Sequence, residues 1–205
     1  MEHKTTNELR ENLTNSELQE LGKQLKLNNK WSFYYHAKNN TKLYNDNTHK
    51  IYDIDNVADF WGTYNNIPTP SKFFYDGINY KKIKRTDETP ASYSFFKDDI
   101  YPAWEEPLNV DGFEFSIKYY NVTNIDTIWL NYLLNIINNN YEYIDYLNGI
   151  RIVDCSNYNK TIYRIELWYL DLTYKNKIEK ELKSYFNISY NTKILYREHK
   201  VLKEK

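Results

Sequence analysis

The sequence predicts a single α+β domain built on a mainly antiparallel sheet. Strand-like segments occur in neighbouring pairs, helical segments are interspersed among them, and no glycine-rich turns follow the strands, as they would in a parallel sheet. With 205 residues, of which 41% are hydrophobic, the chain is long enough for one core of ordinary size. We expect this domain over residues 29–205, preceded by a polar extension over residues 1–28.

The N-terminal half contains one short and one longer helical pattern. In the extension, Ser16 and Gln19 have the spacing of a capping box, and apolar residues follow at helical spacing: Leu18, Leu21 and Leu25. The segment "WSFYYH" (31–36) is typical of a strand. Asp55 or Asn56 then precedes a predicted helix with apolar residues at Val57, Phe60, Trp61 and Tyr64. The segment 68–92 contains three prolines and is expected to be a loop.

The C-terminal half alternates strands and helices. Residues 112–120 place Phe113, Phe115, Ile117 and Tyr119 on one face of a half-buried strand. A helix with a wide apolar face is expected over 126–139. The segments "GIRIVDC" and "TIYRIELWYL" flank the turn "SNYNK" and predict a hairpin. A helical pattern within 171–186 and a strand in "TKILYREH" complete the chain.

Composition excludes several classes of protein. A net charge of −1 and a pI near 6.4 do not suit a protein that grips many phosphates, since bulk affinity for nucleic acid comes from an excess of Lys and Arg. The single Cys155 rules out an internal disulfide or a cysteine-based zinc site. No apolar run is long enough for a membrane span, and the N-terminus lacks a signal peptide's apolar segment. We expect no membrane association, and a location in the cytosol or nucleus.

An enzyme is weakly supported. The loop acids Asp98, Asp99, Glu105 and Glu106 are candidates for metal binding or acid–base work, but solvated loop carboxylates explain them as well. The four histidines are scattered, and neither a phosphate-binding glycine loop nor a nucleophile motif is present. We expect a non-enzymatic protein without metal or cofactor.

The dipeptide Trp104–Glu105, in the loop "YPAWEEP", combines a flat aromatic ring with an anion. A cationic purine such as a methylated guanine is held best between two aromatic faces, by stacking and cation–π attraction. A carboxylate at the edge of guanine accepts from both N1–H and the exocyclic amino group, and so distinguishes guanine from adenine. The dipeptide therefore predicts one stacking plate and one base-reading group.

The chain resembles the translation initiation factor 4E family of mRNA cap-binding proteins over roughly residues 29–200. The stretches that carry the resemblance are "NNKWSFYYH", "VADFWGTYNNI", "YSFFKDDIYPAWEEP", "IWLNYLLNII" and "IELW". The resemblance implies a curved antiparallel sheet of about eight strands, with the cap on the concave face and three helices on the convex face.

It also implies roles for individual residues. Trp104 matches one stacking tryptophan and Glu105 the guanine-reading carboxylate. Tyr44 stands where most members have the second stacking tryptophan, thirteen residues after the position of Trp31. Trp168 matches the tryptophan that lies against the N7 methyl group.

The phosphate-binding positions depart from the family pattern. Arg164 matches a phosphate-binding lysine, but Cys155 stands at the arginine position and Glu114 at another basic position. Lys160 in the turn, or Arg151 on the same strand face as Cys155, are candidates to compensate. The basic run Lys81, Lys82, Lys84 and Arg85 is a further candidate.

A second surface is implied for a partner protein. Val57 and Trp61 on one helix, with Leu130 and Leu134 on another, match the anchors that receive a partner helix of the form Tyr-x-x-x-x-Leu-hydrophobic. Asn131 stands where a glutamate is usual, which removes one ion-pair partner.

We therefore expect a monomeric protein that binds the 7-methylguanosine cap of mRNA and recruits a 4G-like initiation scaffold. It is expected in the cytoplasm, or also in the nucleus, and in the host cytoplasm if its source is viral. Three alternatives stay open: a cap-binding repressor that does not engage the productive scaffold, a structural module whose pocket has drifted, and a metal-dependent nucleotide hydrolase.

Overall fold

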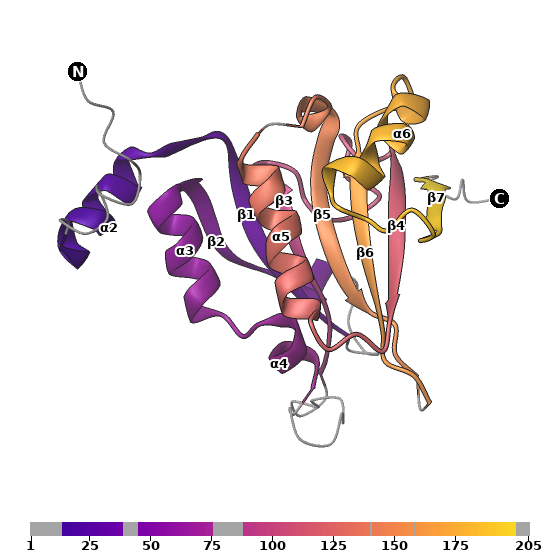
Figure 1. The fold of residues 1–205 in the computed structure, drawn as a ribbon, viewed down its shortest axis with the longest axis horizontal. Coiled ribbons are helices and arrows are strands. Elements are labelled where there is room, and N and C mark those ends of the chain that lie inside the picture. The colour runs from indigo at the N-terminus through magenta and orange to yellow at the C-terminus, as the bar shows by residue number, and fades with distance from the viewer. Residues whose placement is uncertain (1–13, 39–44, 76–87, 140, 158, 200–205) are drawn as a thin grey trace.

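One antiparallel sheet organises the protein (Figure 1). The computed structural model describes residues 14–38, 45–75, 88–139, 141–157 and 159–199. In these residues the strands run in the order β2-β1-β3-β5-β6-β4-β7. Their bounds are β1 Lys26–Lys38, β2 Thr48–Asn56, β3 Thr89–Lys97, β4 Phe113–Tyr120, β5 Leu147–Asp154, β6 Ile162–Tyr169 and β7 Ile194–Glu198. The expected class is confirmed, with seven strands in the described residues against about eight expected.

The sheet has one apolar face because core residues recur at every second position of its strands. On β4, Phe113, Phe115 and Ile117 are fully buried in the main core, as the alternation predicted. On β6, which pairs with β4, the core residues are Ile165, Leu167 and Tyr169. The predicted hairpin is confirmed, since β5 and β6 pair antiparallel with Ile152 opposite Ile165.

Helices cover this apolar face (Figure 1). They are α3 Val57–Asn66, α4 Pro70–Phe74, α5 Ile125–Ile137 and α6 Lys175–Tyr185. The helix predicted over 126–139 is α5, which buries Trp129, Leu133 and Ile136 against the sheet. The predicted helix after Asn56 is α3, and the Asn56 side chain caps it by accepting from the backbone N–H of Asp59 at 2.8 Å.

The opposite face of the sheet is polar except for a separate aromatic cluster. Ser32, Ser94 and Ser116 point to this face on β1, β3 and β4, because they alternate with core residues. At one end of the face, Tyr34, Phe96, Ile100 and Trp168 pack together, with Tyr101 and Trp104 against them. Trp104 and Trp168 thus lie on the face that the helices leave open.

The N-terminal helix differs from the prediction in its cap. Helix α2 spans Asn15–Gln24, and its capping box is formed by Thr14 and Glu17 rather than by Ser16 and Gln19. Thr14 begins the helix because its side chain and backbone exchange hydrogen bonds with Glu17. The helix packs on α3 through Gly22, whose missing side chain lets Ala58 approach closely. Strand β1 then begins at Lys26, before the expected boundary at residue 29.

The expected loop over 68–92 is partly wrong. One of the three prolines that indicated a loop, Pro70, instead stands at the first position of helix α4, where no backbone N–H is needed. Strand β3 starts at Thr89 and extends the sheet. Strand β2, over Thr48–Asn56, was not predicted because its sequence "THKIYDIDN" is polar, as suits an edge strand.

Within the described part of the chain, every helix is too short or too polar to span a bilayer.

Candidate functional site

The loop between β3 and β4 carries Trp104 and Glu105 and is shaped by a buried asparagine. The side chain of Asn109 is fully buried, and its Nδ2 donates to the carbonyl oxygens of Tyr101 and Ala103 at 3.0 and 2.8 Å. These bonds satisfy backbone groups that a loop would otherwise leave unpaired. The backbone around Trp104 is therefore held in one shape before any ligand arrives.

Asn109 also ties this loop to the sheet. Its Oδ1 accepts from Asn148 Nδ2 at 3.0 Å, and its backbone carbonyl accepts from His199 Nδ1 at 2.9 Å. Sequence reasoning missed Asn109, because an asparagine shortly before an Asp–Gly pair is typical of any turn. Only its burial reveals that it positions the site.

Trp168 forms the floor of the aromatic cluster. It lies on β6 with its ring fully buried, and the Phe96 ring meets it edge-on at 5.3 Å between centroids. The His199 ring lies 4.5 Å away. Gly149 makes this packing possible, since a Cβ there would stand 2.3 Å from the Phe96 ring.

A cavity of about 320 Å³ opens beside these rings. It is lined by Ala103, Trp104, Glu105, Arg151 and Trp168. The Trp104 and Trp168 ring centroids are 6.4 Å apart at an angle of 38°. Glu105 is exposed, so its carboxylate is accessible to a ligand. The structure thus brings three predicted site residues, Trp104, Glu105 and Trp168, around one cavity.

A buried carboxylate, Glu166, organises the cations next to the cavity. Its Oε2 accepts from Arg151 Nε at 2.9 Å and from Trp168 Nε1 at 3.1 Å, and its Oε1 accepts from Arg164 Nε at 2.7 Å. Burial alone would raise the pKa of Glu166, but the charges of Arg151 and Arg164 outweigh it and hold the pKa below its usual value. Two guanidinium groups therefore share one carboxylate. Glu166 was not predicted, because its contact with Arg151 depends on the register in which β5 pairs with β6.

Glu114 proves to be neutralised rather than a bare negative charge. It is 3% exposed, and its Oε1 pairs with Arg197 Nη2 at 3.0 Å across the β4–β7 ladder. Its Oε2 lies 3.6 Å from Nε2 of the buried His199. The Arg197 guanidinium also lies over Trp104, with 4.1 Å between Cζ and the ring centroid. Arg197 is not among the described residues that line the cavity.

The other predicted cap-site residues are distributed as follows. Arg164 lies on the same sheet face as Trp168, bound to Glu166. Lys160 is exposed in the β5–β6 turn, where its backbone N–H donates to Asn157, and it is not among the cavity-lining residues described. Cys155 follows β5, and burial raises the pKa of its thiol. Tyr44 and the basic run over 81–85 lie outside the described residues.

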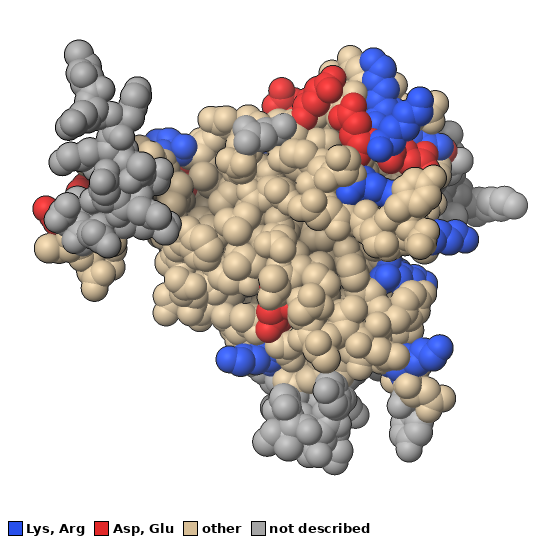
Figure 2. Space-filling model, viewed as in Figure 1, with Lys and Arg blue, Asp and Glu red and all other residues tan. Residues whose placement is uncertain are grey.

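The predicted partner-binding residues lie on the helical face. Trp61 is 37% exposed on α3, and it lines a hollow of about 500 Å³ together with Val57 and Leu18 of α2. Leu130 and Leu134 are half-buried on α5 at the edge of the core. Figure 2 shows that this face carries few charged side chains over α3 and α5, whereas charges gather around α6.

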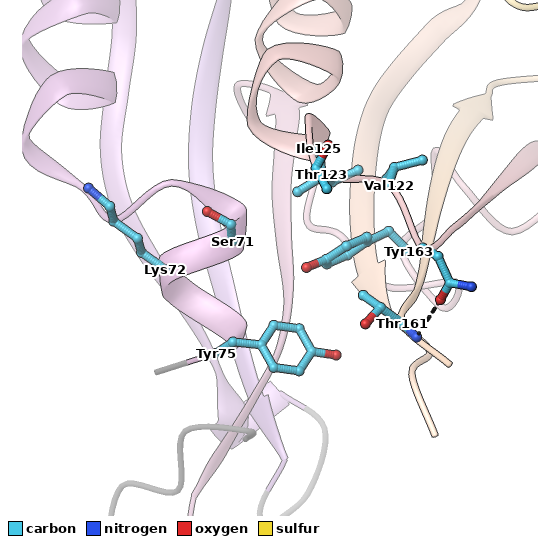
Figure 3. A pocket seen from close by; sticks show the side chains of 9 residues that line it. Ser71, Lys72, Tyr75, Val122, Thr123, Ile125, Thr161 and Tyr163 are labelled. Atoms are coloured by element: carbon cyan, nitrogen blue, oxygen red, sulfur yellow. Dashed lines mark hydrogen bonds between the residues drawn. The ribbon is translucent and has the colours of Figure 1, made fainter. Parts of the chain in front are cut away.

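A larger hollow, of about 540 Å³, lies away from the aromatic cluster, beside α4 (Figure 3). Its tyrosines, Tyr75 and Tyr163, stand edge-on at 87°, so they do not form parallel plates for a planar base. Tyr75 donates to Asp154 at 3.0 Å. The smaller cavity combines indole rings, a carboxylate and an arginine, and is therefore the better candidate for a nucleotide site.

In the described residues, no three side chains of the His, Cys, Asp or Glu type come together to hold a metal ion. The loop acid Asp98 instead accepts from Ser32 at 3.3 Å and pairs with Lys50 at 3.6 Å.

Comparison with known proteins identifies relatives along most of the chain. Residues 26–205 match the sequence model of the family described as Eukaryotic initiation factor 4E. Initiation factor 4E-1B of Danio rerio is 34% identical over 119 residues, 57% of this chain and 49% of its own length. Initiation factor 4E1 of Drosophila melanogaster is 27% identical over 85% of this chain and 62% of its own length. The chain thus spans about half to three fifths of these relatives.

Solved structures agree with this match. The structure of a Caenorhabditis elegans initiation factor 4E-3, in complex with the 4E-binding protein Mextli and a cap analogue, superposes with a TM-score of 0.68 at 26% identity. The match covers 85% of this chain and 92% of that one. A structure of an Ascaris suum initiation factor 4E-3, with a TM-score of 0.69 at 23% identity, shares the fold.

Proposed function

This chain belongs to the eukaryotic initiation factor 4E family, and from that premise we propose that it binds the 7-methylguanosine cap of mRNA and presents its helical face to a translation scaffold. The observation that carries the proposal is the cavity in which Trp104, Glu105 and Trp168 meet Arg151. A relative solved with a cap analogue supports it.

The base is recognised by charge and shape together. Trp104 offers its indole face to the methylated guanine, which is cationic, and stacking in a shielded site adds cation–π attraction. Tyr44 is the proposed second plate. Glu105 accepts from N1–H and the exocyclic amino group, a charge-assisted pair that adenine cannot provide. Trp168, fixed by Glu166, contacts the N7 methyl group from the floor.

The phosphates follow along the polar face of the sheet. Arg164 is the proposed contact that matches the family pattern, and Lys160 in the turn is a second candidate. Each cation adds an ionic hydrogen bond to a phosphate oxygen, which is stronger than a neutral one.

The helical face is proposed to bind the partner. An amphipathic helix of the form Tyr-x-x-x-x-Leu-hydrophobic would lie across Val57 and Trp61 of α3 and reach Leu130 and Leu134 of α5. The few charges on this face in Figure 2 favour an apolar contact. The partner is a 4G-like scaffold, with a translational repressor as the alternative. The protein is proposed to act as a cytoplasmic monomer and without catalysing a reaction.

Capture on resin tests the base recognition. The protein is expected to be retained on immobilised 7-methylguanosine triphosphate and to be eluted by the free methylated nucleotide but not by GTP. Glu105→Gln keeps the shape of the side chain but replaces one acceptor oxygen with a donor, so retention should fall at least about tenfold. Glu106→Gln, one residue further along the same loop, is the matched control and should be retained like the wild type. Equal retention of both variants would exclude Glu105 as the reader.

A further inference from the structure

The cations beside the cavity form a continuous line on the polar face of the sheet. We infer that Arg151, Arg164 and Lys118 form a phosphate track, and that the buried Glu166 is the positioning residue that aims it. This inference rests on the proposed cap binding. It adds Arg151 and Lys118 as ligand contacts and gives Glu166 a role.

Strand register places the three cations on one face. On β5, Arg151 stands between the core residues Ile150 and Ile152, so it points away from the core. Arg164 and Glu166 alternate in the same way on β6, and Glu166 is directly opposite Arg151. Lys118 of β4 is directly opposite Arg164. The track therefore runs from the cavity wall at Arg151, across β6, to β4.

Arg151 connects the track to the proposed base site. It lines the cavity with Trp104 and Glu105, and its Cζ lies 5.2 Å from the centroid of the Trp168 ring. One cavity thus presents a carboxylate and a guanidinium. A methylated cap nucleotide has the complementary pattern, with a cationic base at one end and anionic phosphates at the other.

Glu166 fixes the geometry but does not cancel the charge. It is fully buried and accepts from Arg151, Arg164 and Trp168, so it locks the floor of the cavity and both arginines in one arrangement. The Glu166 carboxylate and its two guanidinium partners together carry one net positive charge. A preorganised cation loses less conformational entropy when it binds an anion.

Lys118, the third cation, is repelled by Arg164, and a bound anion would offset this repulsion. Lys118 is half-buried directly opposite Arg164, and like charges in a cross-strand pair destabilise a sheet. A phosphate between Lys118 and Arg164 would turn this repulsion into two favourable contacts.

A phosphate series separates this inference from the proposed function. Affinities for 7-methylguanosine and its mono-, di- and triphosphates are measured for the wild type and each variant. The wild-type affinity should rise with each phosphate. Arg151→Gln should lose at least about tenfold of the affinity gained with the first phosphate, measured relative to the variant's own affinity for the nucleoside. Lys118→Gln should keep the affinity gained with the first phosphate and lose part of the affinity gained with the second and third.

Further variants test the positioning role. Glu166→Gln places an amide donor among the N–H donors of Arg151, Arg164 and Trp168. It should therefore reduce the affinity gained from the phosphates, as Arg151→Gln does. Glu166→Asp, which keeps a carboxylate, should restore part of it. Lys23→Gln on α2 removes the same charge far from the cavity and should change nothing.

Each failure has a distinct meaning. The phosphate track would be overturned, with base recognition intact, if Arg151→Gln kept the full affinity gained from the phosphates. The same would follow if Lys160→Gln lost that gain instead. A wild type that binds neither nucleoside nor nucleotide would overturn the proposed function itself.

Discussion

Ionisable side chains on the polar face of the sheet differ sharply in their surroundings. Glu114 and Glu166 are both buried, and each is neutralised by arginine: Arg197 for the first, and Arg151 with Arg164 for the second. Breaking either pair would leave a buried carboxylate uncompensated, which is costly. His36, on the same face, lies near the positive charges of Arg151 and Lys38.

His36 should make the fold sensitive to acid. Burial, followed by the charge of Arg151 and smaller effects of Lys38 and His49, lowers the pKa of His36 from 6.5 to about 4. Between these values the unfolded chain binds a proton that the folded chain does not, so stability falls as pH falls from 6.5 to 4. The loss attributable to His36 should reach about 3 kcal/mol at pH 4.

Denaturant unfolding across this pH range checks the effect. His36→Gln removes the titration while a polar side chain still meets Thr48, the partner of His36 Nδ1 at 2.8 Å. The free energy of unfolding of this variant should decline less with acid than that of the wild type. Parallel curves would show that His36 does not carry the acid sensitivity.

For single residues, the sequence predicted the aromatic and carboxylate side chains of the cavity but not the residues that hold them in place. Trp104 and Glu105 are recognisable because they are adjacent in a loop. The roles of Arg197 and Glu166 depend on which residues face each other across strands, and β4 and β7 lie far apart in the sequence. Register is decided by the whole sheet, so no local pattern reveals these pairs.

Elements with strong periodicity were predictable. Helix α3 follows from its Asn56 cap and its apolar spacing, and α5 from its wide apolar face. Elements without such signals were missed: β2 is a polar edge strand, and α4 has five residues and begins at a proline. Helix α2, which was expected to lie in an extension outside the core, leaves Leu18 and Leu21 exposed.

Helix α3 should bind the partner helix mainly through Trp61. Trp61→Ala is expected to weaken binding of a Tyr-x-x-x-x-Leu-hydrophobic peptide at least about tenfold, because an exposed tryptophan is a typical hot spot and its loss removes the largest apolar contact. Tyr190→Ala is a suitable control, since Tyr190 is 89% exposed and lies after α6. Calorimetry of both variants measures the difference.

Pull-down then distinguishes the two kinds of partner. A 4G-like scaffold that is captured by the wild type and lost with Trp61→Ala would support a role in initiation. Capture of a repressor alone would favour the alternative. Peptide affinity unchanged by Trp61→Ala would place the partner surface elsewhere.

The whole molecule separates its two proposed contacts on opposite faces of one sheet. The helical face carries few charged side chains over α3 and α5 (Figure 2). The polar face carries the aromatic cavity and the three cations of the proposed phosphate track, although the net charge of the chain is only −1. A small and chemically distinct ligand is consistent with this distribution, because a long nucleic acid would need a broad excess of positive charge.

Fluorescence titration with a 7-methylated cap dinucleotide and its unmethylated counterpart tests the central claim most directly. Stacking of the methylated base on Trp104 should quench tryptophan emission, and the positive charge of the base should give an affinity roughly thirtyfold higher than that of the unmethylated ligand. Equal affinities for the two ligands, or no quenching by either, would contradict cap recognition by this cavity.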